Sequence, residues 1–246
     1  MNNGIAENIA AVRERIAAAA AKSGRDAGGV RLVAVSKTRS AEEIQAAFEA
    51  GICDFGENKV QEITSKYDIL RGFTKESTKN RNIKWHMIGH LQRNKVKYIT
   101  DKVCMIHSVD SLRLAEEIDR RSSASGVTMD VLLQVNAAAE ESKSGVAPGD
   151  VRQLAADILD RCDNIRMKGL MTIAPAVKEP DDARVYFSEV QSLYDAVGRE
   201  FKCERLDFDC LSMGMTHDFE VAVEEGANIV RVGTGIFGPR VYAQGV

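Results

Sequence analysis

The chain has 246 residues, close to the roughly 250 typical of one eight-stranded barrel of alternating strands and helices. Its 33 Lys and Arg residues are nearly balanced by 36 Asp and Glu residues, which gives a formal net charge of −3 and a pI of about 5.9. This mildly acidic balance lacks the excess of positive charge that is typical of proteins that bind nucleic acid or an anionic membrane. We expect a single domain over residues 1–246.

The N-terminal segment and the cysteines are typical of a soluble cytoplasmic protein. The alanine-rich stretch from Ile5 to Lys22 is interrupted by charged residues, and its longest apolar run, Ile16–Ala21, is too short for a signal sequence or a membrane span. The five cysteines include no pair with CxxC spacing. We therefore expect reduced thiols and neither a disulfide framework nor a zinc site.

A helix is predicted at about residues 5–22, because apolar residues recur there every three or four positions. Eight strand-like runs then alternate with helical patterns. The strands are predicted at Leu32–Val35, Ile52–Phe55, Trp85–Ile88, Val103–His107, Val131–Val135, Met167–Met171, Cys210–Met213 and Ile229–Val232. The helices are predicted at Ala41–Ala50, Lys59–Leu70, Gln92–Tyr98, Leu112–Arg121, Val151–Arg161, Ala183–Arg199 and Phe219–Glu225. This alternation indicates a parallel sheet, and the number eight favours a closed (β/α)8 barrel of the TIM type.

Two polar stretches are predicted as surface loops. Gly72–Lys84 precedes the third strand, and Asn136–Gly149 follows the fifth strand. The second loop is expected on the face of the barrel where the strands end.

A lysine follows the first predicted strand directly, in Ser36-Lys37-Thr38. In sheets of alternating strands and helices, ligands and catalytic groups gather at the carboxyl ends of strands. A partly desolvated lysine amine at that position can attack a carbonyl carbon and form a Schiff base. Taken alone, such a lysine is more often simply solvated.

Two turns rich in small residues follow the last two predicted strands, and they contain Ser212 with Gly214 and Gly233 with Thr234. In a closed barrel, strand eight lies beside strands seven and one, so these turns should lie close to Lys37. Glycine backbone and hydroxyl groups suit an anion, and we expect short helical turns from Met215-Thr216 and Thr234-Gly235 to direct N–H groups at it. Arg231 lies on the same strand face as Gly233 and could reach the ring of the ligand. An amine beside a phosphate cradle suggests pyridoxal 5′-phosphate.

Six motifs follow one another along the chain: Val33–Thr38, Phe55–Glu62, Trp85–Gln92, Ser142–Gly145, Leu211–Met215 and Val230–Gly238. In this order they resemble the pyridoxal phosphate homeostasis proteins (the YggS/PROSC family), and the match runs from about Ile5 to Tyr242. The resemblance implies the barrel of alanine racemase, with Lys37 as the Schiff-base lysine. It also implies that the phosphate is held by Ser212, the backbone around Met213, Gly233 and Thr234, that Arg231 meets the pyridine nitrogen, and that Asn58 lines the pocket.

Three functions fit these residues: a protein that holds pyridoxal phosphate and releases it to apoenzymes without turnover, a racemase-type enzyme using the same cofactor, and a Schiff-base aldolase or other phosphosugar enzyme. Arg231 cannot accept the proton of the pyridine nitrogen, so the electron sink is weak. Racemases with this barrel tolerate a weak sink, but they need a second base, which a tyrosine supplies across a dimer whose subunits carry an extra β domain. The sequence also ends eight residues after Gly238, without the extra β domain of the racemases. We therefore expect a carrier and not an efficient enzyme. We expect it to be monomeric and to meet apoenzymes transiently, with other B6 vitamers as possible ligands.

The remaining chemical groups give weaker signals. His86 and His90 are four residues apart, but they lie in a strand pattern without a third ligand, so we predict no metal site. His90 opens the loop after the third strand and could contact a ligand. The sequence indicates no partner for His107 or His217. The acidic pairs Glu140-Glu141 and Glu224-Glu225 are interpreted as solvated charges.

Overall fold

A computed structural model of the chain describes residues 3–71, 81–138, 144–201 and 203–239. Within these residues, eight strands form one closed barrel in the order β1 to β8, and each strand is parallel to its neighbours. The strands are β1 (Arg31–Val35), β2 (Asp54–Glu57), β3 (Lys84–Met87), β4 (Val103–Val109), β5 (Met129–Val135), β6 (Ile165–Thr172), β7 (Leu206–Met215) and β8 (Ile229–Val232). The predicted (β/α)8 barrel is confirmed.

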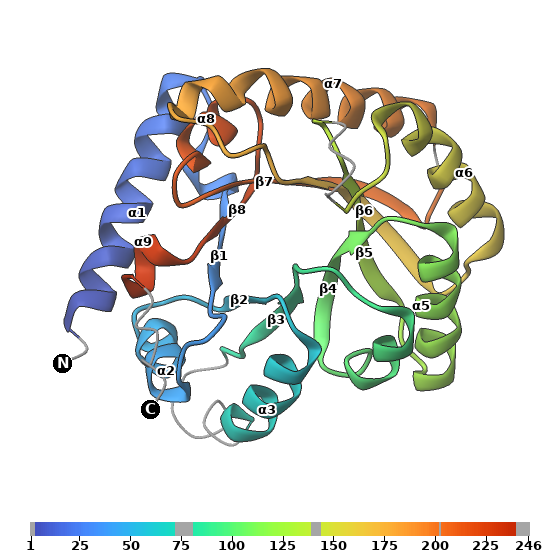
Figure 1. The fold of residues 1–246 in the computed structure, drawn as a ribbon, viewed down its shortest axis with the longest axis horizontal. Coiled ribbons are helices and arrows are strands. Elements are labelled where there is room, and N and C mark those ends of the chain that lie inside the picture. Colours follow the sequence, from blue (N-terminus) through green and yellow to red (C-terminus); the bar gives the residue numbers. More distant parts are fainter. Residues whose placement is uncertain (1–2, 72–80, 139–143, 202, 240–246) are drawn as a thin grey trace.

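Helices surround the ring of strands (Figure 1). The α-helices are α1 (Asn3–Lys22), α2 (Ala41–Glu49), α3 (Val60–Leu70), α5 (Leu112–Ser125), α6 (Val151–Arg161), α7 (Arg184–Glu200), α8 (Phe219–Glu224) and α9 (Thr234–Phe237). Short 3₁₀ helices are η1 (Ala27–Gly29), η2 (Arg93–Tyr98), η3 (Pro148–Asp150) and η4 (Pro180–Ala183). None of the helices in the described ranges is both long and apolar enough to cross a bilayer.

Several predicted boundaries were wrong, for identifiable reasons. The second strand begins at Asp54 and not at Ile52, whose side chain is buried although it precedes the strand. β7 starts four residues earlier than predicted, because Asp207 and Asp209 look like loop residues but pair with Lys168 of β6 at 2.5 and 2.9 Å. The segment predicted as a helix at Gln92–Tyr98 is the 3₁₀ helix η2.

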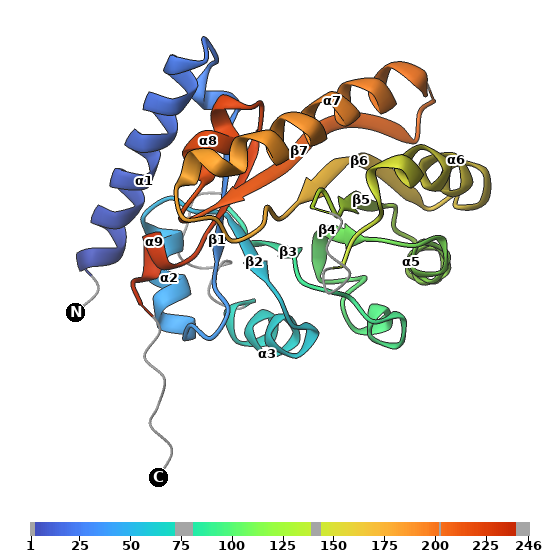
Figure 2. The same cartoon turned by 45° about the horizontal axis from the view of Figure 1, so that its top comes forward.

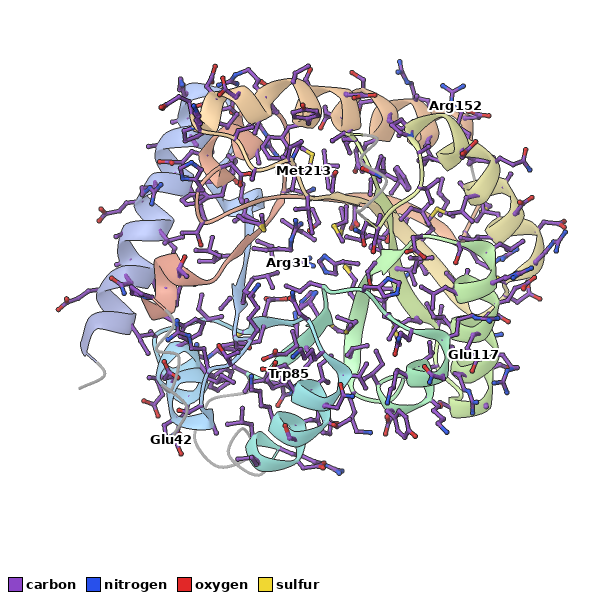
Figure 3. The ribbon with its side chains drawn as sticks, in the orientation of Figure 1. Arg31, Glu42, Trp85, Glu117, Arg152 and Met213 are labelled. Carbon is purple, nitrogen blue, oxygen red and sulfur yellow. The ribbon has the colours of Figure 1, made fainter. Side chains whose placement is uncertain are left out.

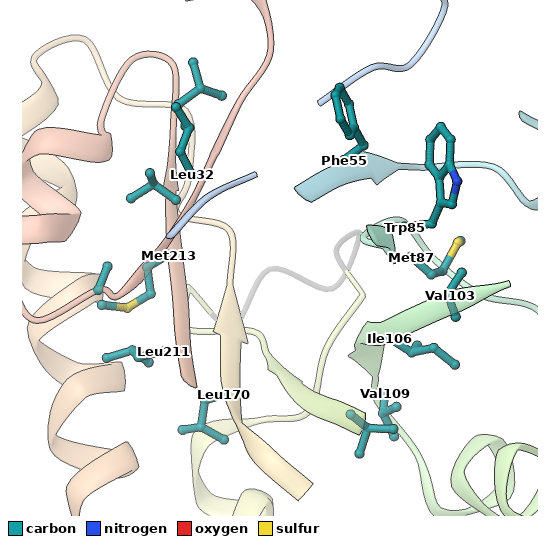
Figure 4. Close-up of a cluster of buried hydrophobic side chains, with 14 of the residues drawn as sticks. Leu32, Phe55, Trp85, Met87, Val103, Ile106, Val109, Leu170, Leu211 and Met213 are labelled. Carbon is teal, nitrogen blue, oxygen red and sulfur yellow. The ribbon is translucent and has the colours of Figure 1, made fainter. Parts of the chain in front are cut away.

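Alternation along the strands divides the core into two layers. Side chains that point outward, among them Leu32, Phe55, Trp85 and Met213, form a large cluster with the surrounding helices (Figure 4). Side chains that point inward form a smaller cluster inside the barrel: Val33, Met105, Leu132, Met171, Cys210 and Ile229. The strand face on which a residue lies therefore decides whether it can reach the barrel interior.

The N-terminal helix covers the barrel next to β8. Figures 1 and 2 show α1 alongside α8 and α9. Its apolar stripe of Ile5, Ile9, Val12 and Ile16 is buried. Exposed ion pairs join Arg15 to Glu220 and Lys22 to Glu224, each at 2.7 Å, and such pairs add little stability. Burial of the apolar stripe is thus what holds α1 against the last two helices.

Candidate functional site

The ends of β7, β8 and β1 lie side by side. β1 pairs with β8 so that Val33 is opposite Arg231, and β7 pairs with β8 so that Met215 is opposite Arg231. A Cβ built on Gly233 would lie 3.4 Å from the Cβ of Val35, two residues before Lys37. The structure therefore brings Lys37, which is half-buried, into the same sector as Gly233 and the exposed Thr234.

Ser212 and Arg231 lie inside the barrel and contact each other. Ser212 is fully buried and Arg231 is 3% exposed. The arginine donates from Nη1 to Ser212 Oγ at 2.6 Å and from Nη2 to the carbonyl oxygen of Thr172 at 2.8 Å. Burial lowers the pKa of Arg231 to about 10, while Asp218 acts in the opposite direction. The guanidinium therefore remains charged at neutral pH.

The side chains of Ser212 and Met213 point to opposite faces of β7, because side chains alternate in direction along a strand. The side chain of Met213 belongs to the outer hydrophobic cluster, between β7 and the helices (Figures 3 and 4). The prediction for this position concerned its backbone, and its side chain faces away from the barrel interior.

The turns after β7 and β8 are joined to each other. Thr216 Oγ1 accepts hydrogen bonds from the backbone N–H of Gly233 at 3.2 Å and of Gly235 at 3.4 Å. Gly214 has a φ of +86°, and a Cβ there would lie 2.7 Å from Phe219 Cα. The short turn predicted from Met215-Thr216 is a single hydrogen-bonded turn, in which the Asp218 N–H donates to the carbonyl oxygen of Met215 at 3.1 Å, and α8 begins at Phe219. The tight turn brings α8 against the site. The turn predicted from Thr234-Gly235 is the short helix α9.

Buried charges hold the backbone on both sides of Lys37. Lys66 Nζ of α3 donates to the carbonyl oxygen of Ser36 at 2.8 Å and to Glu57 Oε1 at 2.7 Å. Ser36 Oγ also donates to Glu57 Oε1, at 2.7 Å. On the other side, the Thr38 N–H donates to Glu62 Oε2 at 2.7 Å, and the same oxygen pairs with Lys66 at 2.9 Å. The lysine loop is thereby fixed to β2 and α3.

Sequence reasoning missed this cluster. Its signal is the i,i+4 spacing of Glu62 and Lys66 after the Phe55–Glu62 motif. Glu57 is fully buried, and its Oε2 has no hydrogen-bond partner among the described residues. Burial raises the pKa of Glu57, even though Lys66 and Ser36 favour its charged form.

Thr38 has a φ of 64°, which is uncommon for a residue with a side chain.

A cavity of about 260 Å³ opens beside this sector, over the ends of β2, β3, β5 and β6. It is lined by Asn58, Ile88, Gly89, His90, Gln134, Val135, Asn136, Ser144 and Ile173. Among the described residues predicted for the site, Asn58 lines this cavity, and the residues on β1, β7 and β8 do not. Ser142 and Lys143 of the predicted motif lie outside the described residues, whereas Ser144 lines the cavity.

His86 and His107 are fully buried inside the barrel and bond to each other, from Nδ1 to Nε2 at 2.9 Å. His107 Nδ1 lies 3.1 Å from Ser212 Oγ, and His86 Nε2 lies 3.0 Å from Asp54 Oδ1. The sequence indicated no partner for His107, and this was wrong. His90 lies apart from both, on the exposed loop, 3.7 Å from Asp110.

The two buried imidazoles differ in charge. Burial opposes a charged His86, but Cys104 and the hydrogen bond to Asp54 outweigh it and raise the pKa of His86 to about 9. Burial, together with the positive charges of His86, Arg231 and Arg31, holds the pKa of His107 well below its ordinary value of 6.5. At neutral pH the pair therefore carries one positive charge. His86 is protonated on both nitrogens, and His107 is neutral.

Known proteins are similar to this chain in sequence and in fold. The family model of the alanine racemase N-terminal domain matches residues 7–241. The chain is 42% identical over 236 residues to the pyridoxal phosphate homeostasis protein of Aquifex aeolicus, covering 96% of this chain and 98% of that protein. A solved structure of an unknown protein from Bifidobacterium adolescentis is 41% identical, with a TM-score of 0.89, and the match covers 96% of this chain and 95% of that one.

PipY of Synechococcus elongatus has been solved with PLP bound. It is 32% identical to this chain, with a TM-score of 0.79, and the match covers 95% of this chain and all of PipY (100%). These matches extend over nearly the whole sequence at identities above 30%. The chain therefore belongs to the pyridoxal phosphate homeostasis protein family, built on the barrel of the alanine racemase N-terminal domain.

Proposed function

We propose that this protein binds pyridoxal 5′-phosphate as a Schiff base on Lys37 and releases it to apoenzymes, with no efficient turnover of its own. The observation that carries the proposal is the meeting of three groups in one sector of the barrel. They are the half-buried Lys37, the joined glycine turns after β7 and β8, and the buried Arg231 two residues before Gly233. The names of the relatives, and the PLP in PipY, support this reading.

The residues present fit the parts of the cofactor. The Lys37 amine would bond the aldehyde carbon with loss of one water, and hydrolysis of the same bond would release the cofactor. Ser212, Gly233, Thr234 and the backbone at Met213 supply donors for the phosphate. Arg231 would meet the ring nitrogen from within the barrel, and Asn58 would line the mouth. When bound, the cofactor supplies an electrophilic aldehyde and an electron-withdrawing ring.

The charge of Arg231 implies a weak electron sink, which racemases with this barrel tolerate only with a second base on the opposite face of the substrate. A guanidinium that remains protonated at neutral pH donates to the ring nitrogen and cannot keep a proton there. Without that proton, the ring stabilises a carbanion weakly. A Schiff-base aldolase could use the same lysine and phosphate turn, and the names of the relatives favour pyridoxal phosphate binding over that alternative.

Borohydride reduction followed by peptide mass mapping tests the role of Lys37. The reduced cofactor should be found on the peptide that contains Lys37, and Lys37→Ala should lose it while its circular dichroism stays unchanged. Lys84→Ala, which removes an exposed lysine at the start of β3, is the matched control and should keep the adduct. A reducible lysine adduct that persists in Lys37→Ala would contradict the assignment.

Thr234→Val tests the phosphate turn. The loss of one charge-assisted hydrogen bond should weaken pyridoxal phosphate binding by about ten-fold. Binding of unphosphorylated pyridoxal should barely change. An equal loss for both ligands would contradict a phosphate role for Thr234.

An assay with single enantiomers of amino acids tests the absence of turnover. The loaded protein should racemise or transaminate them no faster than free cofactor does. Turnover at about 1 per second, the low end for ordinary enzymes, would favour the racemase function instead.

A further inference from the structure

The strand ladder between β1 and β8 ends before the segments that carry the proposed site. The last paired residues are Ala34 of β1 and Val232 of β8. Beyond this pair the two segments bond to opposite neighbours: the Ser36 N–H donates to a carbonyl oxygen of β2 at 3.1 Å, and the Gly233 N–H donates to the turn after β7 at 3.2 Å. The ladder therefore does not hold the lysine loop, residues 36–39, against the turn after β8.

The side chain of Arg39 connects the lysine loop to the end of α9. Its Nη2 donates to the carbonyl oxygen of Gly238 at 2.5 Å and to that of Pro239 at 3.2 Å. Its guanidinium also lies 5.7 Å from the centroid of the Phe237 ring, within the range of a cation–π contact. Figures 1 and 2 show α9 near α2, which begins two residues after Arg39. Arg39 therefore spans the gap that the ladder leaves open.

Helix α9 carries this contact to Thr234, because α9 is a single hydrogen-bonded turn. The Gly238 N–H donates to the carbonyl oxygen of Thr234 at 3.0 Å, and the Phe237 N–H donates to that of Gly233 at 2.9 Å. Gly238 thus bonds Thr234 through its N–H and Arg39 through its carbonyl oxygen. Holding this end of α9 limits where Thr234 can move.

Arg39 is equally fixed on the side of the lysine. Its backbone N–H donates to the carbonyl oxygen of Ser36 at 3.0 Å, which closes a four-residue turn with Lys37 and Thr38 in the middle. Its Nη1 donates to Glu43 Oε1 of α2 at 3.2 Å, and its side chain is only 11% exposed. The position of Arg39 therefore follows that of Lys37, and little of its surface is left for a ligand.

We propose that Arg39 is a positioning residue for cofactor binding: it fixes the distance from the Lys37 amine to the turn at Thr234, so that one molecule can bind covalently at one end and through its phosphate at the other. This inference rests on the proposed function, which assigns the aldehyde and the phosphate to these two residues. Two contacts to one ligand reinforce each other most when the protein holds them at a fixed separation, since otherwise binding must also order the two segments. Arg39 itself need not touch the cofactor.

The ratio of the affinities for pyridoxal phosphate and for 5′-deoxypyridoxal, which has the same aldehyde but no phosphate, measures this effect. Arg39→Met should lower the ratio by about ten-fold, because the phosphate contact is no longer held at the right distance, while the affinity for 5′-deoxypyridoxal changes by less than about two-fold. A variant that only loosened the fold would weaken the binding of both ligands alike. An unchanged ratio in Arg39→Met would therefore overturn the inference.

Arg39→Lys separates position from charge. Lysine keeps the positive charge, but one ammonium cannot reproduce the planar fork that bonds Glu43 and two carbonyl oxygens. If Arg39 acts by position, Arg39→Lys should lower the ratio about as much as Arg39→Met does. If Arg39 acts only by attracting the phosphate, Arg39→Lys should keep the wild-type ratio, and the inference would be overturned.

Arg15 provides the matched control. It also joins a carboxylate to an aromatic ring, because it bonds Glu220 at 2.7 Å and lies 4.6 Å from the centroid of the Phe219 ring. It lies on α1, however, and among the described residues it bonds neither the lysine loop nor α9. Arg15→Met and Arg15→Lys should both leave the ratio unchanged.

Amide hydrogen exchange of the ligand-free protein tests the connection without any cofactor. The N–H groups of Phe237 and Gly238, which close α9, should exchange about five-fold faster or more in Arg39→Lys than in wild type, because the end of α9 opens more readily once it is released. The N–H groups of β8 should exchange at their wild-type rates. Unchanged exchange in α9 would overturn the inference.

The outcomes separate this inference from the proposed function. A wild-type protein that binds no pyridoxal phosphate would contradict the proposed function, and this inference with it. A wild-type protein that binds it, with a ratio that neither Arg39→Met nor Arg39→Lys changes, would overturn the role of Arg39 alone.

Discussion

Neighbouring residues in this barrel have different roles because strand side chains alternate in direction. Ser212 points inward and contacts Arg231, whereas Met213 packs among the outer helices. The same alternation places Arg231 inside the barrel and its neighbours Val230 and Val232 outside. A residue type alone, without its strand face, is thus a poor guide to the site.

Lys66 shows how much stability is lost when one partner of a buried ion pair is removed. Lys66→Met should lower the free energy of unfolding by about 3–5 kcal/mol, because it leaves Glu57 buried without its cation. The double variant Glu57→Gln/Lys66→Met should recover much of that loss. Urea denaturation measures both.

Lys22→Met is the control for this prediction. Lys22 pairs with Glu224, but its side chain is 69% exposed, so the loss should stay below about 1 kcal/mol. If Lys66→Met cost no more than Lys22→Met, the buried cluster would not be what fixes the Lys37 loop.

The elements that matter most for the site are β7, β8 and the turns that follow them. Thr216 accepts hydrogen bonds from the turn after β8, so the two turns form one unit. The turn after β7 requires Gly214, because of its positive φ and its close contact with Phe219. The packing of α8 therefore determines the position of the site backbone.

Gly214→Ala should lower the free energy of unfolding by at least about 2 kcal/mol, since a Cβ disfavours this φ and would meet α8. It should also weaken pyridoxal phosphate binding. Gly4→Ala is the control, because a Cβ at Gly4 meets nothing within 4 Å in helix α1. A Gly214→Ala protein as stable as Gly4→Ala would show that the turn tolerates a side chain.

Across the whole molecule, the buried histidine pair couples stability to pH. In the folded state His86 holds its proton up to about pH 9, and His107 remains neutral far below pH 6.5. In the unfolded chain both titrate near 6.5. From pH 6.5 to 9 the folded state therefore binds more protons, and below 6.5 the unfolded state does.

The contribution of the pair to stability should accordingly be greatest near pH 6.5 and fall in both directions. The fall should be steepest between about pH 7.5 and 8, at about 1.2 kcal/mol per pH unit, and near pH 9 it should drop to about half of that. Denaturation of wild type and of His86→Gln across this range measures it as the difference between the two curves. A difference that rises between pH 7 and 9 would contradict the proton assignment.

The sequence by itself determined the alternation of strands and helices, and hence the barrel, because apolar periodicity is a local property of the chain. It also marked Lys37 and the two glycine turns, because the carboxyl ends of strands follow directly from the order of the elements. It placed β2 too early and β7 too short, because Ile52 is apolar in a loop and Asp207 and Asp209 are charged in a strand.

Only the tertiary structure decided which distant side chains meet. Asp54, His86, His107, Ser212 and Arg231 come from five strands, and no spacing along the chain relates them. Their contacts arise because closing the sheet brings inward-pointing residues of facing strands to the same axis. Burial in that interior then shifts their pKa values, which depend on neighbours in space and not on neighbours in sequence.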